Sequence, residues 1–487
     1  MNKDFSCISP IDDEIVWSGT ETSAADVRRA MQKSAAAASS WRETDVQQRI
    51  EIVQQFAGHL ERHRDDVAHL ISREVGKLTW DAQGEVAAAI AKADLSIQAL
   101  QQRRSDQVPP AEPAGDSATL TRAVRYQPIG VALVLGPFNF PLHLPGGQII
   151  PALLAGNTVV FKPSDQATAV GRWIADAWNK VGLPPDVLQL IVGGVDTAIA
   201  AIDAPEVAGV FLTGSRAAGR AIHRQLAGRP EVLLALELGG NNPIVVSDEV
   251  DAEVAASIVS FSAFVSAGQR CTCARRAIYV HNQVAPQSGG LAQFDALIRA
   301  TEALRVGLPE EPDTQIGPLI SRSAADSLHE TYDRLVQLGC EPLAEWRVDP
   351  RRENLVFPSI LDASKISEEA FASIGEMEWF GPLLVVRVAK DLDKATHLAA
   401  QTPYGLAASL LGGDQHAFET FVQNVGAGVV NWNRATTGAA GTLPFGGRGH
   451  SGNHRPAGFY AIDFCNEPIS SLQLEHPDTS DPWSVTK

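Results

Sequence analysis

The chain has 487 residues, 45% of them hydrophobic, which is enough for two or three domains with buried cores. A net charge of −17 and a pI of about 5.2 argue against nucleic acid and anionic membranes as main partners, since both favour a basic surface. The five cysteines are scattered and odd in number, and the N-terminus lacks the apolar core of a secretory signal. We therefore expect a reducing, cytoplasmic location.

The N-terminal quarter of the chain has helical spacing. Helices are predicted over Ser23 to Trp41, capped at Thr22 or Ser23, and over Thr44 to His63, capped at Thr44, with two or three more up to about Arg104. The proline-rich segment 106–117 is typical of a connector. Strand patterns at 118–126 and 131–135 then predict a hairpin that projects from the body.

Residues 126–161 contain no Asp, Glu, Lys or Arg, and such an uncharged stretch could be mistaken for a membrane-spanning helix. Five prolines between 128 and 151 would break such a helix repeatedly. We expect buried strands and loops in this stretch rather than a membrane span.

Apolar strands alternate with helices from Thr158 to Glu237, which predicts a parallel sheet covered on both faces, an architecture typical of nucleotide binding. A second alternating block runs from 251 to 430, with helices expected near 255–267, 290–304 and 322–338. The polar tail after Glu475 is expected to be loosely held.

A candidate nucleophile lies in the segment FVSAGQRCTCARR, residues 264–276. A thiol attacks as the thiolate, and the neighbouring Arg270, Arg275 and Arg276 would favour ionisation of Cys271. The alternative is that Cys271 is a small buried hydrophobe, which is a common role of free cysteines.

Two strand ends carry residues suited to a dinucleotide. Backbone N–H groups of a glycine-bounded loop that opens a helix can bind a pyrophosphate, and this loop comprises Gly214, Ser215, Arg216, Ala217, Ala218 and Gly219. An ordinary tight turn would explain the loop about as well, because this strand-helix turn has neither a P-loop lysine nor GxGxxG. Lys162 and Asp165 are placed to hold ribose hydroxyls, and a carboxylate there would repel a 2′-phosphate, which favours NAD over NADP. A simple helix cap at Ser164 or Asp165 is the alternative.

Five motifs occur in an order that resembles the aldehyde dehydrogenase superfamily: GPFNFP around Asn139, ELGG from Glu237, GQRC ending at Cys271, EWFGP with Glu378 and Phe380, and PFGG at 444–447. The resemblance implies Cys271 as the nucleophile, Glu237 as the base that activates water, and the Asn139 amide as the donor to the oxyanion. It also implies that Glu378 contacts the nicotinamide ribose, that NAD is the cofactor and that no metal takes part.

The same resemblance implies an α/β fold of two doubly wound parallel-sheet domains plus a small β oligomerisation element. We expect the NAD-binding domain in 1–117 and 136–237 with a return near 431–455, and the catalytic domain in 238–430. The oligomerisation element is expected in 118–135 and 456–487, and would give a homodimer or homotetramer.

Within the superfamily, GQRCTCARR, VNWNRATTGAA and SGNHRP resemble the members that oxidise N-succinylglutamate 5-semialdehyde in bacterial arginine breakdown. Such a substrate carries two carboxylates, which arginine binds well. About two of five candidates are expected to contact it, and these are Arg270, Arg434, Arg448, His454 and Arg455. Oxidation of another acidic semialdehyde, succinic or glutamic, or a non-catalytic binding role are the alternatives.

Overall fold

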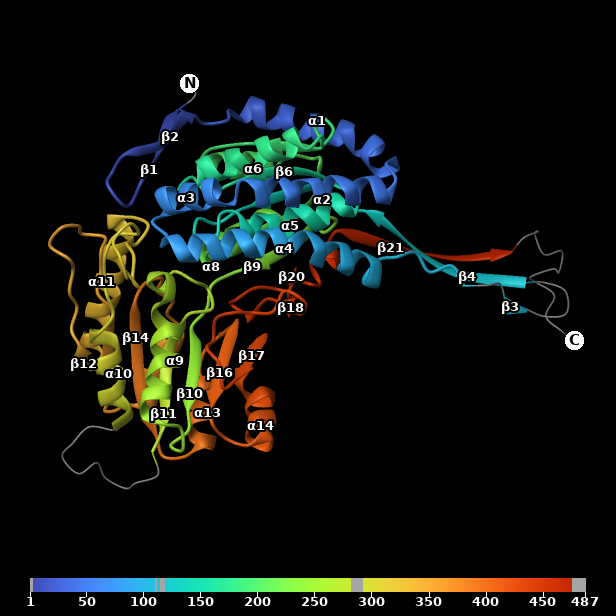
Figure 1. Cartoon of the computed structure of the whole chain (residues 1–487). Helices are drawn as coiled ribbons and strands as arrows, with labels where there is room; N and C mark the ends of the chain where they lie inside the picture. Colours follow the sequence, from blue (N-terminus) through green and yellow to red (C-terminus); the bar gives the residue numbers. More distant parts are fainter. Residues whose placement is uncertain (1–2, 110–111, 114–118, 282–291, 475–487) are drawn as a thin grey trace, which may run out of the picture.

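The computed structural model describes residues 3–109, 112–113, 119–281 and 292–474. Figure 1 shows two sheets, each covered by helices, one above the other, and a long arm of strands that extends to one side. The α/β class with parallel sheets is confirmed. In the described residues no helix combines the length and the apolar character needed to cross a membrane.

The first sheet has five parallel strands in the order β7-β6-β5-β8-β9. Every residue of β5 and β6 is buried, as expected for parallel strands covered on both faces. The strand order reverses between β5 and β8, and ligands of doubly wound sheets bind outside the carboxyl ends of strands at such a point. The strands are β5 (Val131–Leu135), β6 (Thr158–Lys162), β7 (Leu188–Leu190), β8 (Val207–Thr213) and β9 (Leu233–Glu237).

Among the described residues, eight helices cover this sheet. The side chain of Ser23 caps the first, as predicted, whereas Asp45 caps the second in place of the expected Thr44. One apolar cluster joins the sheet to α1, α7 and α8, and another joins its opposite face to α2 through α6. The helices are α1 (Ala24–Glu43), α2 (Val46–Arg62), α3 (Arg64–Val75), α4 (Thr79–Arg103), α5 (His143–Leu154), α6 (Thr168–Lys180), α7 (Val195–Ile202) and α8 (Arg216–Gln225).

The uncharged stretch corrects two expectations. Part of it is the helix α5, although only strands and loops were expected there. Pro145 is tolerated because it lies in the first turn, where a backbone N–H has no helical acceptor, and Pro151 lies one turn from the end. The strand at 131–135 was assigned to the projecting hairpin, but it is β5 at the centre of the sheet.

The second sheet has seven strands in the order β12-β13-β14-β11-β10-β16-β17, and only the edge strand β12 is antiparallel. Its strands are β10 (Asn242–Val246), β11 (Ala274–Val280), β12 (Glu341–Ala344), β13 (Ser359–Asp362), β14 (Leu383–Ala389), β16 (Ala407–Leu411) and β17 (Val429–Trp432). Its helices are α9 (Ala252–Phe264), α10 (Ala292–Glu302), α11 (Arg322–Gln337), α12 (Glu368–Gly375), α13 (Leu392–Ala400) and α14 (Gln415–Val425). A single cluster of buried side chains forms its core.

The arm consists of β4 (Thr119–Pro128), which pairs on one side with β21 (Asn466–Leu474) and on the other with β3 (Glu112–Pro113). Ile469, Leu472 and Leu474 of β21 are exposed. Only 119–128 of the expected hairpin belongs to the arm, and the tail after Glu475 lies outside the described residues. The remaining strand pairs are β1 (Asp4–Ile8) with β2 (Ile15–Thr20), β15 (Tyr404–Gly405) with β19 (Arg448–Gly449), and β18 (Pro444–Phe445) with β20 (Ala457–Gly458).

The chain was expected to return to the NAD-binding domain near 431–455, but only part of this range contacts the five-stranded sheet. Residues 429–432 form β17 of the seven-stranded sheet. Contact with the five-stranded sheet is made by Ser451 and Asn453, whose carbonyl and amide groups hydrogen-bond Leu238 and Leu236. The two sheets are therefore held together at the end of β9.

Candidate active site

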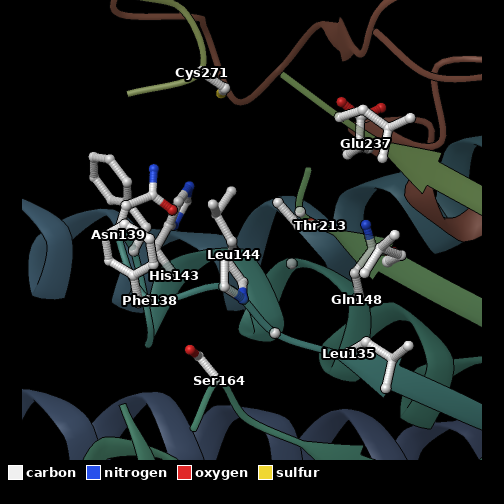
Figure 2. A pocket seen from close by; sticks show the side chains of 18 of the residues that line it. Leu135, Phe138, Asn139, His143, Leu144, Gln148, Ser164, Thr213, Glu237 and Cys271 are labelled. Carbon is white, nitrogen blue, oxygen red and sulfur yellow. The ribbon is translucent and has the colours of Figure 1, made fainter. Parts of the chain in front are cut away.

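A cavity of about 1260 Å³ lies where the carboxyl ends of β5, β6, β8 and β9 face the start of the seven-stranded sheet. Cys271, Glu237 and Asn139 all line it, together with Gly214, Ser215 and Lys162. Figure 2 shows Cys271 and Glu237 on one side of this cavity, with Asn139, His143 and Leu144 facing them. The sequence candidates for the nucleophile, the base and the oxyanion donor thus meet in one space.

The loop before Cys271 has an unusual backbone. Ser266, Ala267 and Gly268 all have positive φ, and a Cβ at Gly268 would lie 2.2 Å from the carbonyl oxygen of Gly381. The Arg275 guanidinium donates to the carbonyls of Gly268 and Arg270 at 2.8 and 3.2 Å. Such a strained run persists only where the surroundings fix it, so the nucleophile is held in a rigid loop.

Asn242 fixes the other side of this loop. Its Nδ2 donates to the carbonyls of Cys271 and Cys273, both at 2.7 Å, and its Oδ1 accepts from the N–H of Ala407 at 3.0 Å. The residue is only 1% exposed. Asn242 therefore positions the nucleophile from the first residue of β10.

The Cys271 thiol is partly exposed to the cavity, and burial raises its pKa to about 12, with the nearby carboxylates of Glu237 and Glu378 acting in the same direction. The expectation that the neighbouring arginines favour the thiolate is wrong for Arg270 and Arg276. Arg270 pairs with Asp81 at 2.8 Å, and Arg276 is buried against Asn241. Only the charge of Arg275 lowers the thiol pKa, and its effect is smaller than that of burial.

Asn139 follows β5 in the loop that leads to α5. Its Nδ2 donates to the carbonyl of Gln269 at 2.9 Å, two residues before Cys271. An amide carries two N–H donors, so one remains to face the cavity. The side chain is thus fixed in orientation relative to the nucleophile.

Glu237 is the last residue of β9 and is 5% exposed. Neither of its carboxylate oxygens has a hydrogen-bond partner within the described residues, and a Cβ at Gly446 would lie 2.2 Å from Oε1. Burial raises its pKa well above the usual value. A carboxylate with a raised pKa and free lone pairs is a stronger base and is suited to take a proton from water.

The other half of the cavity has the chemistry that a dinucleotide needs. Gly214, Ser215 and Ala218 line it at the start of α8, where the Ser215 hydroxyl caps the helix. Lys162 and Asp165 line it at the end of β6, and Glu378 and Phe380 line it from the loop before β14. Arg216, Ala217 and Gly219 of the predicted loop are not among the lining residues.

Two further contacts explain parts of this region. The Glu378 Oε1 accepts from the N–H of Gly240 at 3.0 Å and would overlap any side chain at Gly239. Arg216 contacts Nε2 of His450 at 2.9 Å instead of facing the cavity. A helix N-terminus that opens into the cavity, beside a lysine and carboxylates suited to ribose hydroxyls, fits a nicotinamide dinucleotide.

The sequence model of the aldehyde dehydrogenase family matches residues 1–469. The chain belongs to the aldehyde dehydrogenase family.

Among curated relatives, this aldehyde dehydrogenase is 42% identical to an N-succinylglutamate 5-semialdehyde dehydrogenase of Burkholderia ambifaria, over 96% of this chain and 93% of the relative. It is also 42% identical to the protein of that name from Burkholderia vietnamiensis, over 98% and 96%. Among solved structures it is similar to an indole-3-acetaldehyde dehydrogenase of P. syringae in complex with NAD+, with a TM-score of 0.88, 26% identity, and coverage of 97% and 93%.

Of the five candidate substrate residues of this aldehyde dehydrogenase, Arg270 is the one that lines the cavity. Arg434, Arg448, His454 and Arg455 are exposed and are not among the lining residues. They lie in the segments around β17 and β19, whose small residues Gly438 to Gly441 approach the cavity instead. About two of the five were expected to contact the substrate, and Arg270 is the one that lies where it could do so.

Sequence reasoning missed one wall of the cavity, which the helix α4 forms together with the start of α5. Lys92 and Gln148 are buried there and His143 is half-buried. Desolvation lowers the pKa of His143 to about 3, so its imidazole is neutral. Asn242 was also missed as a positioning residue. The signal for Lys92 was its place on the same helix face as Asp81 and Glu85, at spacings of four and seven residues.

Proposed function

We propose that this aldehyde dehydrogenase oxidises N-succinylglutamate 5-semialdehyde to N-succinylglutamate with NAD. The observation that carries the reaction type is that Cys271, Asn139 and Glu237 line one cavity with the Gly214–Ser215 helix start. The substrate is supported by the two Burkholderia relatives of that name.

In the proposed mechanism the Cys271 thiol loses its proton to water in the cavity as the sulfur attacks the aldehyde carbon, and the resulting oxyanion is held by the free amide N–H of Asn139 and the backbone N–H of Cys271. The Gly214–Ser215 turn would hold NAD, which would supply the hydride acceptor, and loss of hydride from the adduct would leave a thioester on Cys271. Glu237 then takes a proton from water as the water attacks the thioester, which releases the acid. Transfer to coenzyme A is disfavoured because this base is present.

The proposed preference for NAD rests on Asp165, which lines the cavity and whose negative charge would repel a 2′-phosphate. Replacing the charge with an amide of the same shape, in D165N, should improve use of NADP relative to NAD. A ratio of kcat/KM values for the two cofactors that stays unchanged in D165N would contradict this assignment.

We also propose a cytoplasmic homo-oligomer, a dimer or tetramer, in which the arm of β4 and β21 pairs with a second copy. The exposed apolar residues of β21 support this, because an unpaired apolar strand edge favours association. Sedimentation of the chain with and without L472D would test it, since the variant should dissociate.

The first test of function is NADH production with N-succinylglutamate semialdehyde, succinic semialdehyde and a neutral aldehyde of similar length. C271A should abolish turnover. The matched control is C273A, which removes the fully buried thiol two residues away and should leave turnover in place. Equal turnover of all three aldehydes would refute the substrate, and activity of C271A would refute the mechanism.

A further inference from the structure

One face of the helix α4 carries three charged residues into the cavity: Asp81, Glu85 and Lys92. Positions separated by four, seven and eleven residues fall on the same side of a helix. The three residues are 4, 2 and 7% exposed. This face therefore carries charge that is largely buried.

The two carboxylates on this face are neutralised by partners. Asp81 pairs with Arg270 at 2.8 Å, and Glu85 pairs with Lys77 at 2.6 Å while accepting the backbone N–H groups of Leu142 and His143. Lys92, in contrast, has neither an ion pair nor a hydrogen bond within the described residues. The wall formed by α4 thus holds one positive charge in excess, although the whole chain is acidic.

The surroundings of Lys92 offer no internal compensation. Burial alone lowers its pKa, and no carboxylate contributes in the opposite direction. Its Cε would lie 3.7 Å from a Cβ at Gly147, so the lysine stem runs over a position of α5 that has no side chain. Nearby, Nδ1 of His143 and Oε1 of Gln148 are buried without partners among the described residues. A buried unpaired cation is costly, and an anion that enters the cavity would remove this cost.

The spacing along α4 sets the length of molecule that could reach this charge. Asp81, which holds the residue preceding Cys271, lies eleven positions before Lys92, or about 16 Å at 1.5 Å per residue. Side chains lean toward the helix N-terminus, so the Lys92 amino group covers part of this length, and the span that remains to the nucleophile end is on the order of 10 to 16 Å. The distal carboxylate of extended N-succinylglutamate 5-semialdehyde is roughly eight bonds from the aldehyde carbon, which is about 10 Å.

We propose that Lys92 binds the distal, succinyl carboxylate of the substrate and thereby determines the preference for the succinylated semialdehyde. This inference rests on the proposed function and names the residue that reads one end of that substrate. The α-carboxylate nearer the aldehyde is left to other groups of the cavity.

The test compares two substrates that differ mainly in the distal carboxylate, N-succinylglutamate semialdehyde and N-acetylglutamate semialdehyde. K92M keeps the length of the side chain and removes its charge. Its KM for the succinylated substrate should rise about 10- to 100-fold, as expected for loss of a charged hydrogen bond, while its KM for the acetylated substrate and for NAD should not follow. K92R should retain part of the preference.

R448M is the matched control, because Arg448 is an exposed cationic candidate that does not line the cavity. A preference that falls equally in R448M and K92M, or is unchanged in K92M, would overturn the inference. If K92M does not fold, K92Q can replace it. The product N-succinylglutamate should then inhibit K92Q more weakly than it inhibits the wild-type enzyme. If the wild-type enzyme itself showed no preference for acidic semialdehydes, the proposed function would fail, which is a different result from loss of the Lys92 effect alone.

Discussion

Asn242 offers a direct test of how the nucleophile is held. In N242A, two carbonyls and one backbone N–H in a buried site lose their hydrogen bonds, those of Cys271, Cys273 and Ala407. At about 1 kcal/mol for each, the free energy of unfolding should fall by about 3 kcal/mol. The loop that carries Cys271 should also shift, and a displacement of about 1 Å at the reacting atom can cost about 100-fold in kcat.

The neighbouring residue provides the control for this prediction. Asn241 is equally buried and also makes three hydrogen bonds, but to Ile374, Met377 and Arg276, away from the nucleophile. N241A should lose at least as much stability, measured by urea unfolding, with a smaller loss of kcat and a smaller change in the rate of alkylation of Cys271. Equal losses of kcat in the two variants would show that the effect of Asn242 is general destabilisation, and the positioning argument would be refuted.

Three further predictions follow from the same geometry. N139A should lower kcat by about 100- to 1000-fold through loss of the oxyanion donor, with the affinity for NAD unchanged in a fluorescence titration. E237Q should retain a pre-steady-state burst of NADH but lose most of its steady-state turnover. The wild-type rate should rise as pH increases through the raised pKa of Glu237, and this rise should be missing in E237Q. Absence of the burst would contradict the role of the base. Burial raises the pKa of Glu74 to about 7 from its usual 4.5, so the stability that this carboxyl contributes is complete below about pH 4.5 and is lost as pH rises through 7. The difference in melting temperature between pH 5 and pH 8 should therefore shrink in E74Q, and an unchanged difference would refute this assignment.

The sequence could predict those parts of the site in which the residue type and its local motif indicate the chemical role. A cysteine after Gly-Gln, a glutamate at the end of an apolar strand and an asparagine between prolines and phenylalanines could be ordered along the chain before any coordinates were known. The parallel sheet was equally predictable from its uninterrupted apolar strands. The helix α5 was not, because its prolines and lack of charge gave no helical periodicity.

Electrostatic roles could not be predicted, since they depend on which charges become neighbours. Arg270 was expected to face the substrate or ionise the thiol, but Asp81, 189 positions away in sequence, pairs with it. Lys92 was not predicted as a site residue, because lysines on long helices usually lie on the solvated face. Only the packing of α4 against α5 reveals that this one is enclosed and unpaired.

Four residues, from Leu238 to Asn241, carry the chain from the end of β9 to the start of β10, and thus from one sheet to the other. The proposed base is the last residue before this crossing, while the proposed nucleophile precedes β11 on the far side. The separation of the two groups is consequently set by how the two halves of the molecule sit on each other. A substitution that only loosens the junction between the halves, and leaves both folded, should therefore appear first as slow turnover and only later as a lower melting temperature.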